Sequence, residues 1–235
     1  MQHALITGCT RGLGYHLLKA YLEDEWTVFP LVRNAASIRH LIEEHAGRCF
    51  PIISDITGRD IETKLQSVLH ANGAKLSVII NNAGTGGRRE PSIVEVDAEF
   101  LSSMVSTHCI GAISVVRAAL PFVHKGASTV VNVSSRLGSA HRNGNKEFSG
   151  LGFSYTYRIA KASQNMATLC MSQDSELSGV TVCAVHPGRL KTDSGAFDAD
   201  TEPAIAAQRM KSRIESLTIE DNGTYIDLDN GTIPW

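Results

Sequence analysis

The chain has 235 residues, a formal net charge of −2 and 43% hydrophobic residues. This length and composition are typical of one globular α/β domain with a substantial core, and the near-neutral charge argues against nucleic acid or an anionic membrane as a partner. The five cysteines are scattered and none forms Cys-x-x-Cys, which argues against a zinc site or a disulfide framework and favours a cytoplasmic compartment. No charged leader precedes the apolar residues 4–6, no apolar run is expected to span a bilayer, and no dedicated metal is expected.

Residues 4–7 predict a short buried strand, which a glycine-rich turn joins to a helical pattern. The turn carries Gly8, Gly12 and Gly14. Glycines let the backbone approach a pyrophosphate, and the helix N-terminus offers free N–H groups to it. Because the turn lies between a strand and a helix, the pattern favours a dinucleotide site over a glycine-rich loop without a ligand.

Residues 27–32 predict the second strand, and Arg33 follows its end. Dinucleotide folds that prefer NAD usually place an acid there, to bind the ribose hydroxyls. Arg33 and a second cation in the glycine loop, Arg11, instead suit a 2′-phosphate and predict NADP(H). The alternative is that Arg33 is solvated and Arg11 caps the loop.

The next segments predict helices over residues 35–46 and 58–71 and strands over 50–54 and 76–80. Asp55 follows the third strand and either binds the adenine amino group or caps a helix. Small and amide residues at 81–84 end the fourth strand and suit a chain that passes close to a cofactor. Residues 85–96 predict a polar, exposed loop. A long helix over residues 97–123 follows, and its length is compatible with the interface of a homodimer.

The C-terminal half continues the alternation. Its expected strands are residues 129–133, 180–185 and 224–226, and its expected helices begin at residue 154 and cover 203–217. Residues 139–153 predict a loop that shapes a pocket wall, 193–202 a mobile segment and 229–231 a tight turn. Strands alternating with helices predict an α/β fold, a single Rossmann-type doubly wound parallel sheet of about seven strands with helices on both faces. The whole chain, 1–235, is then one domain, in which 193–217 form a substrate-side loop and helix.

Ligands of such sheets bind beyond the carboxyl ends of the strands. The glycine loop, Arg33, Asp55, residues 81–84, Ser135 and residues 187–188 all follow predicted strand ends. Six features at one edge of the sheet predict a ligand site there.

Tyr157 and Lys161 are four residues apart, so they share one face of the predicted helix. A nearby ammonium favours the phenolate and lowers the pKa of a tyrosine, and a phenol tuned in this way exchanges a proton with an alcohol or carbonyl oxygen. The spacing alone is weak evidence, because Tyr15 and Lys19 share it and a surface tyrosine packed on a lysine stem explains it equally well. The surrounding motifs favour the catalytic interpretation.

Taken together, these motifs resemble those of the short-chain dehydrogenase/reductase family over essentially the whole chain. The matching positions are Thr7, Gly8, Gly12, Gly14, residues 81–84, Ser135, Tyr157, Lys161, Pro187, Gly188 and Thr192. The long gap between Ser135 and Tyr157, together with residues 155–158, 186–193 and 229–235, is similar to the sniffer-type and C-factor-like carbonyl reductases.

The resemblance implies a role for each matching residue. Tyr157 protonates the substrate oxygen, Lys161 holds the nicotinamide ribose and lowers the pKa of Tyr157, and Ser135 rather than its neighbour Ser134 stabilises the substrate oxygen. With the residue chemistry above, it places the cofactor against Gly8, Thr10, Arg11, Gly12, Leu13, Gly14, Arg33, Asp55, Ile56, Asn82, Ala83, Gly84, Tyr157, Lys161, Pro187, Gly188, Leu190 and Thr192.

One position departs from the family pattern. Members usually have an asparagine in the long helix, three residues before a glycine that corresponds to Gly111, and this chain has His108 there. In the family the asparagine helps to hold a water in a proton relay to the lysine. His108 either holds such a water, joins the relay directly because histidine titrates near pH 6.5, the reference value, or is a packed helix residue that weakens the relay.

The resemblance implies an oxidoreductase that transfers hydride between NADP(H) and a carbonyl or alcohol substrate, with aldehyde or ketone reduction as the expected direction. The catalytic residues are then Ser135, Tyr157, Lys161 and His108. The alternative is a regulatory or signalling protein that binds NADP(H) with little turnover, which His108 favours and the intact Tyr157 and Lys161 disfavour. A third interpretation is an enzyme that reduces an imine or an activated double bond.

Overall fold

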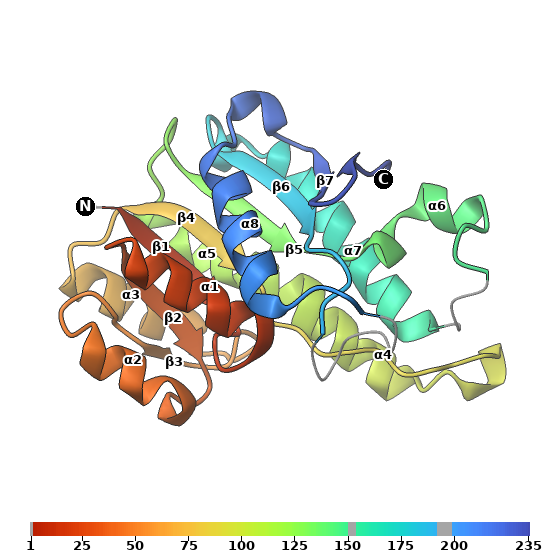
Figure 1. Cartoon of the computed structure of the whole chain (residues 1–235), viewed down its shortest axis with the longest axis horizontal. Coiled ribbons are helices and arrows are strands. Elements are labelled where there is room, and N and C mark those ends of the chain that lie inside the picture. Colours follow the sequence, from red (N-terminus) through yellow and green to blue (C-terminus); the bar gives the residue numbers. More distant parts are fainter. Residues whose placement is uncertain (1, 150–153, 192–198) are drawn as a thin grey trace.

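One eight-stranded sheet organises the molecule, in the strand order β3-β2-β1-β4-β5-β6-β7-β8 (Figure 1). This is a computed structural model, and it describes residues 2–149, 154–191 and 199–235. The strands are β1 His3–Thr7, β2 Thr27–Val32, β3 Ile52–Ile53, β4 Leu76–Asn81, β5 Thr129–Val133, β6 Thr181–His186, β7 Tyr225–Asp227 and β8 Gly231–Thr232. All neighbouring pairs are parallel except β7 with β8. The predicted parallel sheet is confirmed, with one short antiparallel edge strand that the sequence did not predict.

Helices cover both faces of this sheet. The α-helices are α1 Gly12–Glu23, α2 Arg39–Glu44, α3 Ile61–Ala71, α4 Ala98–Val105, α5 Gly111–Ala119, α6 Ala140–Gly144, α7 Tyr155–Ser172 and α8 Pro203–Glu215. Shorter helical turns are η1 Ala36–Ile38, η2 Ile93–Glu95, η4 Leu120–Phe122, η5 Arg136–Gly138, η6 Ser175–Leu177 and η7 Ile219–Asp221, and η3 Ser106–Ile110 is a π-helix. Helices α1 and α8 pack together on one face, and α3, α5 and α7 lie behind the sheet (Figure 1).

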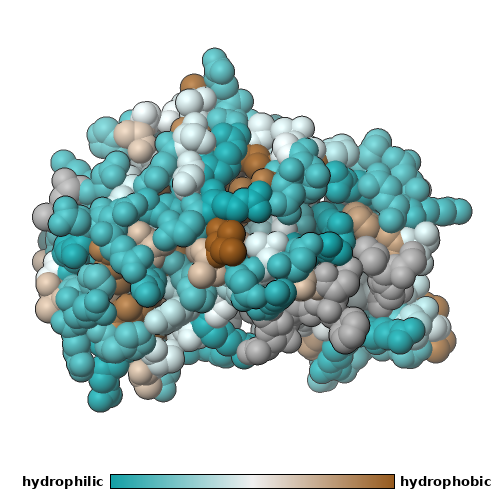
Figure 2. All heavy atoms as spheres, in the orientation of Figure 1, coloured by the Kyte–Doolittle hydropathy of each residue, from teal (hydrophilic) through white to brown (hydrophobic). Residues whose placement is uncertain are grey.

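Alternation along the buried strands divides the core between the two faces. In β1, Ile6 joins the core under α1 and α8, which includes Leu17, whereas Leu5 joins the core under α3 and α5, which includes Leu65 and Val115. Successive strand side chains point to opposite faces, so a strand covered on both sides is apolar throughout. The outer surface over α1 and α8 is mostly hydrophilic, with single apolar side chains between polar ones (Figure 2).

The long helix predicted over residues 97–123 is divided into α4, the π-helix η3, α5 and the 3₁₀ turn η4. By length and hydropathy the stretch Ala98–Phe122 is long and apolar enough to cross a membrane, so the expectation that no run has this length is wrong. In this fold α5 packs on α3 and α4 packs on α7. Ile110 and Ile113 are exposed on this stretch. A homodimer through it stays a prediction, which sedimentation tests.

Several predicted segments differ from the structure. The 35–46 segment divides into η1 and α2, the third strand shrinks to two residues, and the 58–71 helix begins at Ile61. The described part of 139–153 contains α6, and the 85–96 segment contains η2 and a buried acid, Glu90, so it is neither a plain loop nor wholly exposed. Residues 150–153, and 193–198 of the predicted mobile segment, lie outside the described residues.

Candidate active site at the carboxyl ends of the strands

A cavity of about 880 Å³ opens beyond the carboxyl ends of the central strands. Its volume lies in the upper part of the range that ligand pockets occupy. Predicted cofactor positions that line it are Gly8, Thr10, Arg11, Gly12, Leu13, Gly14, Arg33, Asp55, Ile56, Asn82, Ala83, Gly84, Tyr157, Lys161, Pro187 and Leu190. Gly188 is not among its lining residues, and Thr192 lies outside the described residues. The features predicted at separate strand ends therefore meet around one space.

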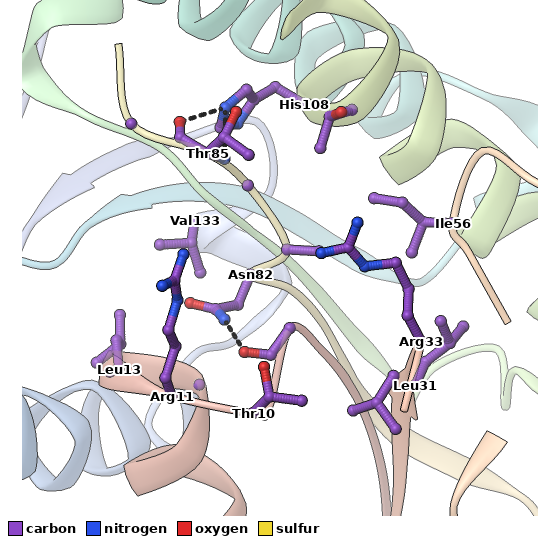
Figure 3. A pocket seen from close by; sticks show the side chains of 18 of the residues that line it. Thr10, Arg11, Leu13, Leu31, Arg33, Ile56, Asn82, Thr85, His108 and Val133 are labelled. Atoms are coloured by element: carbon purple, nitrogen blue, oxygen red, sulfur yellow. Dashed lines mark hydrogen bonds between the residues drawn. The ribbon is translucent and has the colours of Figure 1, made fainter. Parts of the chain in front are cut away.

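The glycine loop is packed too tightly for side chains. Gly8 has a left-handed φ of +72°, and a Cβ on Gly14 would collide with the Gly8 carbonyl oxygen and with the Asn82 amide. The Asn82 Nδ2 donates to the Thr7 and Gly8 carbonyl oxygens at 3.0 and 3.1 Å and ties the end of β4 to this loop (Figure 3). The Arg11 side chain makes no cap hydrogen bond to α1, so the first-turn N–H groups remain available to a phosphate.

Two arginines extend into the cavity from different elements. Arg11 comes from the start of α1 and Arg33 from the end of β2, and their side chains enter from two sides of the space (Figure 3). Two guanidinium groups make this end of the cavity favourable for a phosphate group.

Asp55 lies at the same end but caps no helix. Its Oδ1 accepts hydrogen bonds from the Thr57 N and Oγ1 at 2.9 and 2.7 Å, and α3 begins only at Ile61, after Asp60. These hydrogen bonds, with the nearby Arg33 charge, hold the pKa of Asp55 below its ordinary value. The helix-cap alternative is wrong, and a contact with adenine stays a prediction.

Tyr157 lies in the first turn of α7, beside Ser135 at the end of β5. The Ser135 side chain is close enough to Tyr157 to lower the pKa of its phenol, whereas the Ser134 hydroxyl donates to Asn165 Oδ1 at 2.6 Å. Ser134 lines the cavity, but its hydroxyl is engaged with α7. Ser135 is not among the lining residues of the cavity, but it is the serine whose side chain acts on the pKa of the phenol.

Lys161 follows one turn later and is buried. Its Nζ donates to the Val133 carbonyl oxygen at 2.7 Å and to Gln164 Oε1 at 2.9 Å, and it lies 5.9 Å from the centre of the Tyr157 ring. Burial lowers the pKa of Lys161 to about 7. Burial also raises the pKa of Tyr157, although the hydrogen bond with Ser135 opposes it. The sequence argument that Lys161 lowers the phenol pKa is thus wrong for this structure, because it neglected desolvation.

The π-helix η3 places His108 in the cavity wall. Its Nε2 lies 3.0 Å from the Thr85 carbonyl oxygen, and its Nδ1 is buried without a hydrogen-bond partner among the described residues (Figure 3). The ring meets that of Tyr157 edge-on, with centroids 6.0 Å apart. A Cβ on Gly84 would collide with the imidazole, so Gly84 is the residue that makes room for it. Burial, assisted by the Lys161 charge, lowers the pKa of His108 to about 3, so the imidazole is neutral near pH 7 and does not titrate near pH 6.5 as its reference value suggested.

We expect His108→Asn to make folding less sensitive to acid. The pKa of His108 is about 3 in the folded protein and near the reference value of about 6.5 in the unfolded chain. Between these values the unfolded state binds more protons, so the stability of the wild type falls as the pH falls, by up to about 1.4 kcal/mol per pH unit. Urea unfolding between about pH 4.5 and 7 should show a shallower loss for the variant. Equal slopes for the two proteins would contradict the neutral, buried histidine.

Several residues around the site were not singled out from the sequence. Thr85, Val133 and Gln164 hold the two titratable side chains through their backbone or amide oxygens, and Glu90 contacts the start of α7. Backbone acceptors carry no residue-type signal. Gln164 is three residues after Lys161, a helical neighbour spacing that the sequence does contain. Among the described residues, no group of three or more His, Cys, Asp or Glu side chains is placed to hold a metal ion.

Comparisons with known proteins agree with this geometry. The model of the protein family described as "short chain dehydrogenase" matches residues 2–203 of this chain. The C-signal protein of Myxococcus xanthus is 32% identical over 161 residues, which cover 68% of this chain and 93% of that protein. The 1-hydroxy-2-glutathionyl-2-methyl-3-butene dehydrogenase of Rhodococcus sp. (strain AD45) is 28% identical over 185 residues, which cover 77% of this chain and 78% of that protein.

Solved structures resemble the whole chain. The carbonyl reductase Sniffer of D. melanogaster superposes with a TM-score of 0.88 and 26% identity, over 100% of both chains. The NADPH-bound carbonyl reductase from chicken fatty liver has a TM-score of 0.87 and 24% identity, over 100% of this chain and 99% of that one, and this likeness shows the fold alone.

Proposed function

Because the chain belongs to the short-chain dehydrogenase family, we propose that this oxidoreductase is an NADP(H)-dependent carbonyl reductase that reduces an aldehyde or ketone. The observation that carries the proposal is the half-buried Tyr157 in the wall of a cavity that the glycine loop and two arginines also line, with Ser135 close enough to lower the pKa of its phenol. The five free cysteines agree with a cytoplasmic location, which belongs to the same proposal.

The cavity fits NADP(H) on grounds internal to this chain. The glycine loop leaves backbone N–H groups of α1 facing a phosphate position, and Arg11 and Arg33 line the same cavity and would hold the 2′-phosphate. Tyr157, Lys161 and Pro187 line the cavity as well and would hold the nicotinamide half. When bound, NADPH supplies the hydride for the carbonyl carbon.

The side chains of this protein then supply the proton and hold the substrate oxygen. Burial raises the pKa of Tyr157, so its phenol is protonated at neutral pH and suited to donate a proton to a carbonyl oxygen. Ser135 donates a second hydrogen bond to that oxygen and stabilises its developing charge. Lys161, with a pKa near 7, replaces the proton that Tyr157 gives up. A protonated phenol supports reduction as the working direction.

His108 takes a place in this proposal as a neutral hydrogen-bonding group. Its Nε2 is engaged with Thr85, and its buried Nδ1 is an acceptor that a water molecule linked to Lys161 would satisfy. With a pKa of about 3 it is not a titrating member of the relay. Of the three interpretations open at the sequence level, the structure therefore supports a water-holding role over direct proton transfer.

We expect Arg33→Asp to reverse the preference between the two nicotinamide cofactors. The change removes a cation from the cavity wall and adds an acid that repels a 2′-phosphate and accepts from ribose hydroxyls. NADPH affinity should fall by about 10- to 100-fold while NADH affinity holds or rises. Fluorescence titration with both nucleotides measures the ratio. Arg117→Asp on α5, outside the cavity lining, is the matched control, and an unchanged ratio in Arg33→Asp would contradict the phosphate contact.

One comparison favours a second candidate function. The C-signal protein is named as a signal rather than as a dehydrogenase, and it is 32% identical to this chain. A regulatory protein that binds NADP(H) with little turnover would use the same cavity. Such a protein needs no proton donor, so Tyr157 in the cavity wall with Ser135 close to it counts against this alternative.

A further inference from the structure

Glu90 is a buried acid in a segment whose arginines face solvent. It lies between β4 and η2 and is 2% exposed, whereas Arg88 and Arg89 beside it are exposed. Acidic side chains are almost never fully buried unless a partner holds them. Its burial therefore needs a specific reason.

The partner of Glu90 is the N-terminus of α7. Its Oε2 accepts hydrogen bonds from the Thr156 N at 2.9 Å, from the Thr156 Oγ1 at 3.0 Å and from the Ser154 Oγ at 3.5 Å. Its Oε1 is buried and finds no hydrogen-bond partner among the described residues. First-turn N–H groups have no partner within their own helix, and a carboxylate is favourable there. Glu90 thus caps α7 from a distant part of the chain.

The capped turn is the one that carries the phenol. Thr156 directly precedes Tyr157, and the Tyr157 N donates to Ser154 Oγ at 3.4 Å. Gly87, three residues before Glu90, packs on the same turn, because a Cβ there would lie 2.5 Å from the Tyr157 Cβ and 2.8 Å from Ser154 Oγ. Gly87 therefore packs against the Tyr157 side chain, and Glu90 holds the start of α7 through the backbone N–H of Thr156.

The same segment begins at the cofactor side of the cavity. Gly84 and Thr85 contact His108 and lie directly after residues 81–83, which end β4. A strap of seven residues, 84–90, therefore connects the cavity wall to the helix that presents the phenol. A shift of about 1 Å in a group that must meet a reacting atom costs on the order of 10²-fold in rate.

We propose that Glu90 is a positioning residue that holds Tyr157 against the substrate oxygen by capping the first turn of α7. The kinetic part of this inference rests on the proposed function, in which Tyr157 is the proton donor. The structural part, the cap itself, does not depend on turnover.

Amide hydrogen exchange tests the cap. In Glu90→Ala, exchange at residues 155–158 should be roughly tenfold faster than in the wild type, because a charge-assisted hydrogen bond to the helix is lost. Glu90→Gln keeps one acceptor oxygen and should retain most of the protection. Glu95→Ala, which removes an exposed acid from η2, is the matched control and should leave this exchange unchanged.

Kinetics with NADPH and a substrate carbonyl test the positioning. We expect kcat to fall by about 10- to 100-fold in Glu90→Ala and in Glu90→Asp, whose shorter carboxylate no longer reaches Thr156, and to stay near the wild-type value in Glu90→Gln. The NADPH dissociation constant should be unchanged in all three. In a Tyr157→Phe background Glu90→Ala should cause no further loss of kcat, because the residue acts only through the phenol.

The outcomes separate this inference from the proposed function. Unchanged exchange at residues 155–158 in Glu90→Ala overturns the cap, whether or not the protein turns over a carbonyl. A wild-type kcat in folded Glu90→Ala and Glu90→Asp, or an equal further loss in the Tyr157→Phe background, overturns the positioning role. If the wild-type protein reduces no carbonyl, the proposed function and the kinetic role fall together, and the exchange result still decides the cap.

Discussion

Tyr157→Phe lowers kcat by about 10²- to 10⁴-fold, the range that a general acid typically contributes, and leaves the NADPH dissociation constant nearly unchanged. The change removes one hydroxyl from a half-buried ring whose phenol pKa the nearby Ser135 lowers. The aromatic ring remains to fill its place in the cavity wall, so the fold and the cofactor space are retained. Steady-state kinetics and a fluorescence titration with NADPH measure the two quantities.

Tyr15→Phe is the matched control for this experiment. Tyr15 has the same spacing to Lys19 that Tyr157 has to Lys161, but Tyr15 is not among the residues that line the cavity, and its hydroxyl meets His40 Nε2 at 3.0 Å. Its removal should not change kcat. Wild-type turnover in Tyr157→Phe would remove the phenol from the mechanism, and an equal loss in both variants would show that the assay reports stability and not chemistry.

Lys161→Met lowers kcat by about 10²- to 10³-fold, comparable with removal of a preorganised donor, and weakens NADPH binding as well. Lys161 lines the cavity one turn after Tyr157 on α7, and burial brings its pKa to about 7, where it can pass a proton at neutral pH. Methionine retains the length and the apolar stem of the side chain, so the space in the core remains filled. Stopped-flow reduction and NADPH titration separate the two effects.

Lys211→Met provides a stringent control, because Lys211 is another buried lysine. It lies on α8, where its Nζ meets Asp24 Oδ2 at 2.5 Å and Glu215 Oε1 at 2.7 Å, and these partners raise its pKa against the opposing effect of burial. Its loss should lower stability and leave kcat and NADPH affinity unchanged. Wild-type kinetics in folded Lys161→Met would contradict its role in proton supply.

Much of the fold is predictable because buried parallel strands have a strong local signal. The bounds of β2 and β5 agree with the predicted runs 27–32 and 129–133, since both are mostly apolar and are followed by a polar residue, Arg33 or Ser134. The antiparallel β8 was not predicted, because two exposed residues after a turn carry no hydrophobic alternation. The π-helix η3 was not predicted either, because the apolar periodicity runs on through it.

The candidate site, like the fold, was predictable from the sequence only in part. Residue types at strand ends placed Arg33 and Asn82 around one cavity, because a doubly wound sheet brings those ends together, and the helical spacing to Lys161 placed Tyr157 in its wall. Burial was the quantity that the sequence did not provide. It reverses the expected pKa direction of Tyr157 and makes His108 a neutral group. Burial also distinguishes Glu90 from the other residues of its polar stretch, because Glu90 accepts a hydrogen bond from the first turn of α7.

The most direct test is a titration of the purified protein with NADPH and NADH, followed by a panel of aldehydes and ketones with absorbance read at the reduced-nicotinamide band. The account predicts that NADPH binds more tightly than NADH and is oxidised when a suitable carbonyl is added. NADPH binding without turnover across the panel would contradict the reductase proposal and favour the regulatory one. If neither nucleotide binds, the assignment of the cavity to a dinucleotide is wrong.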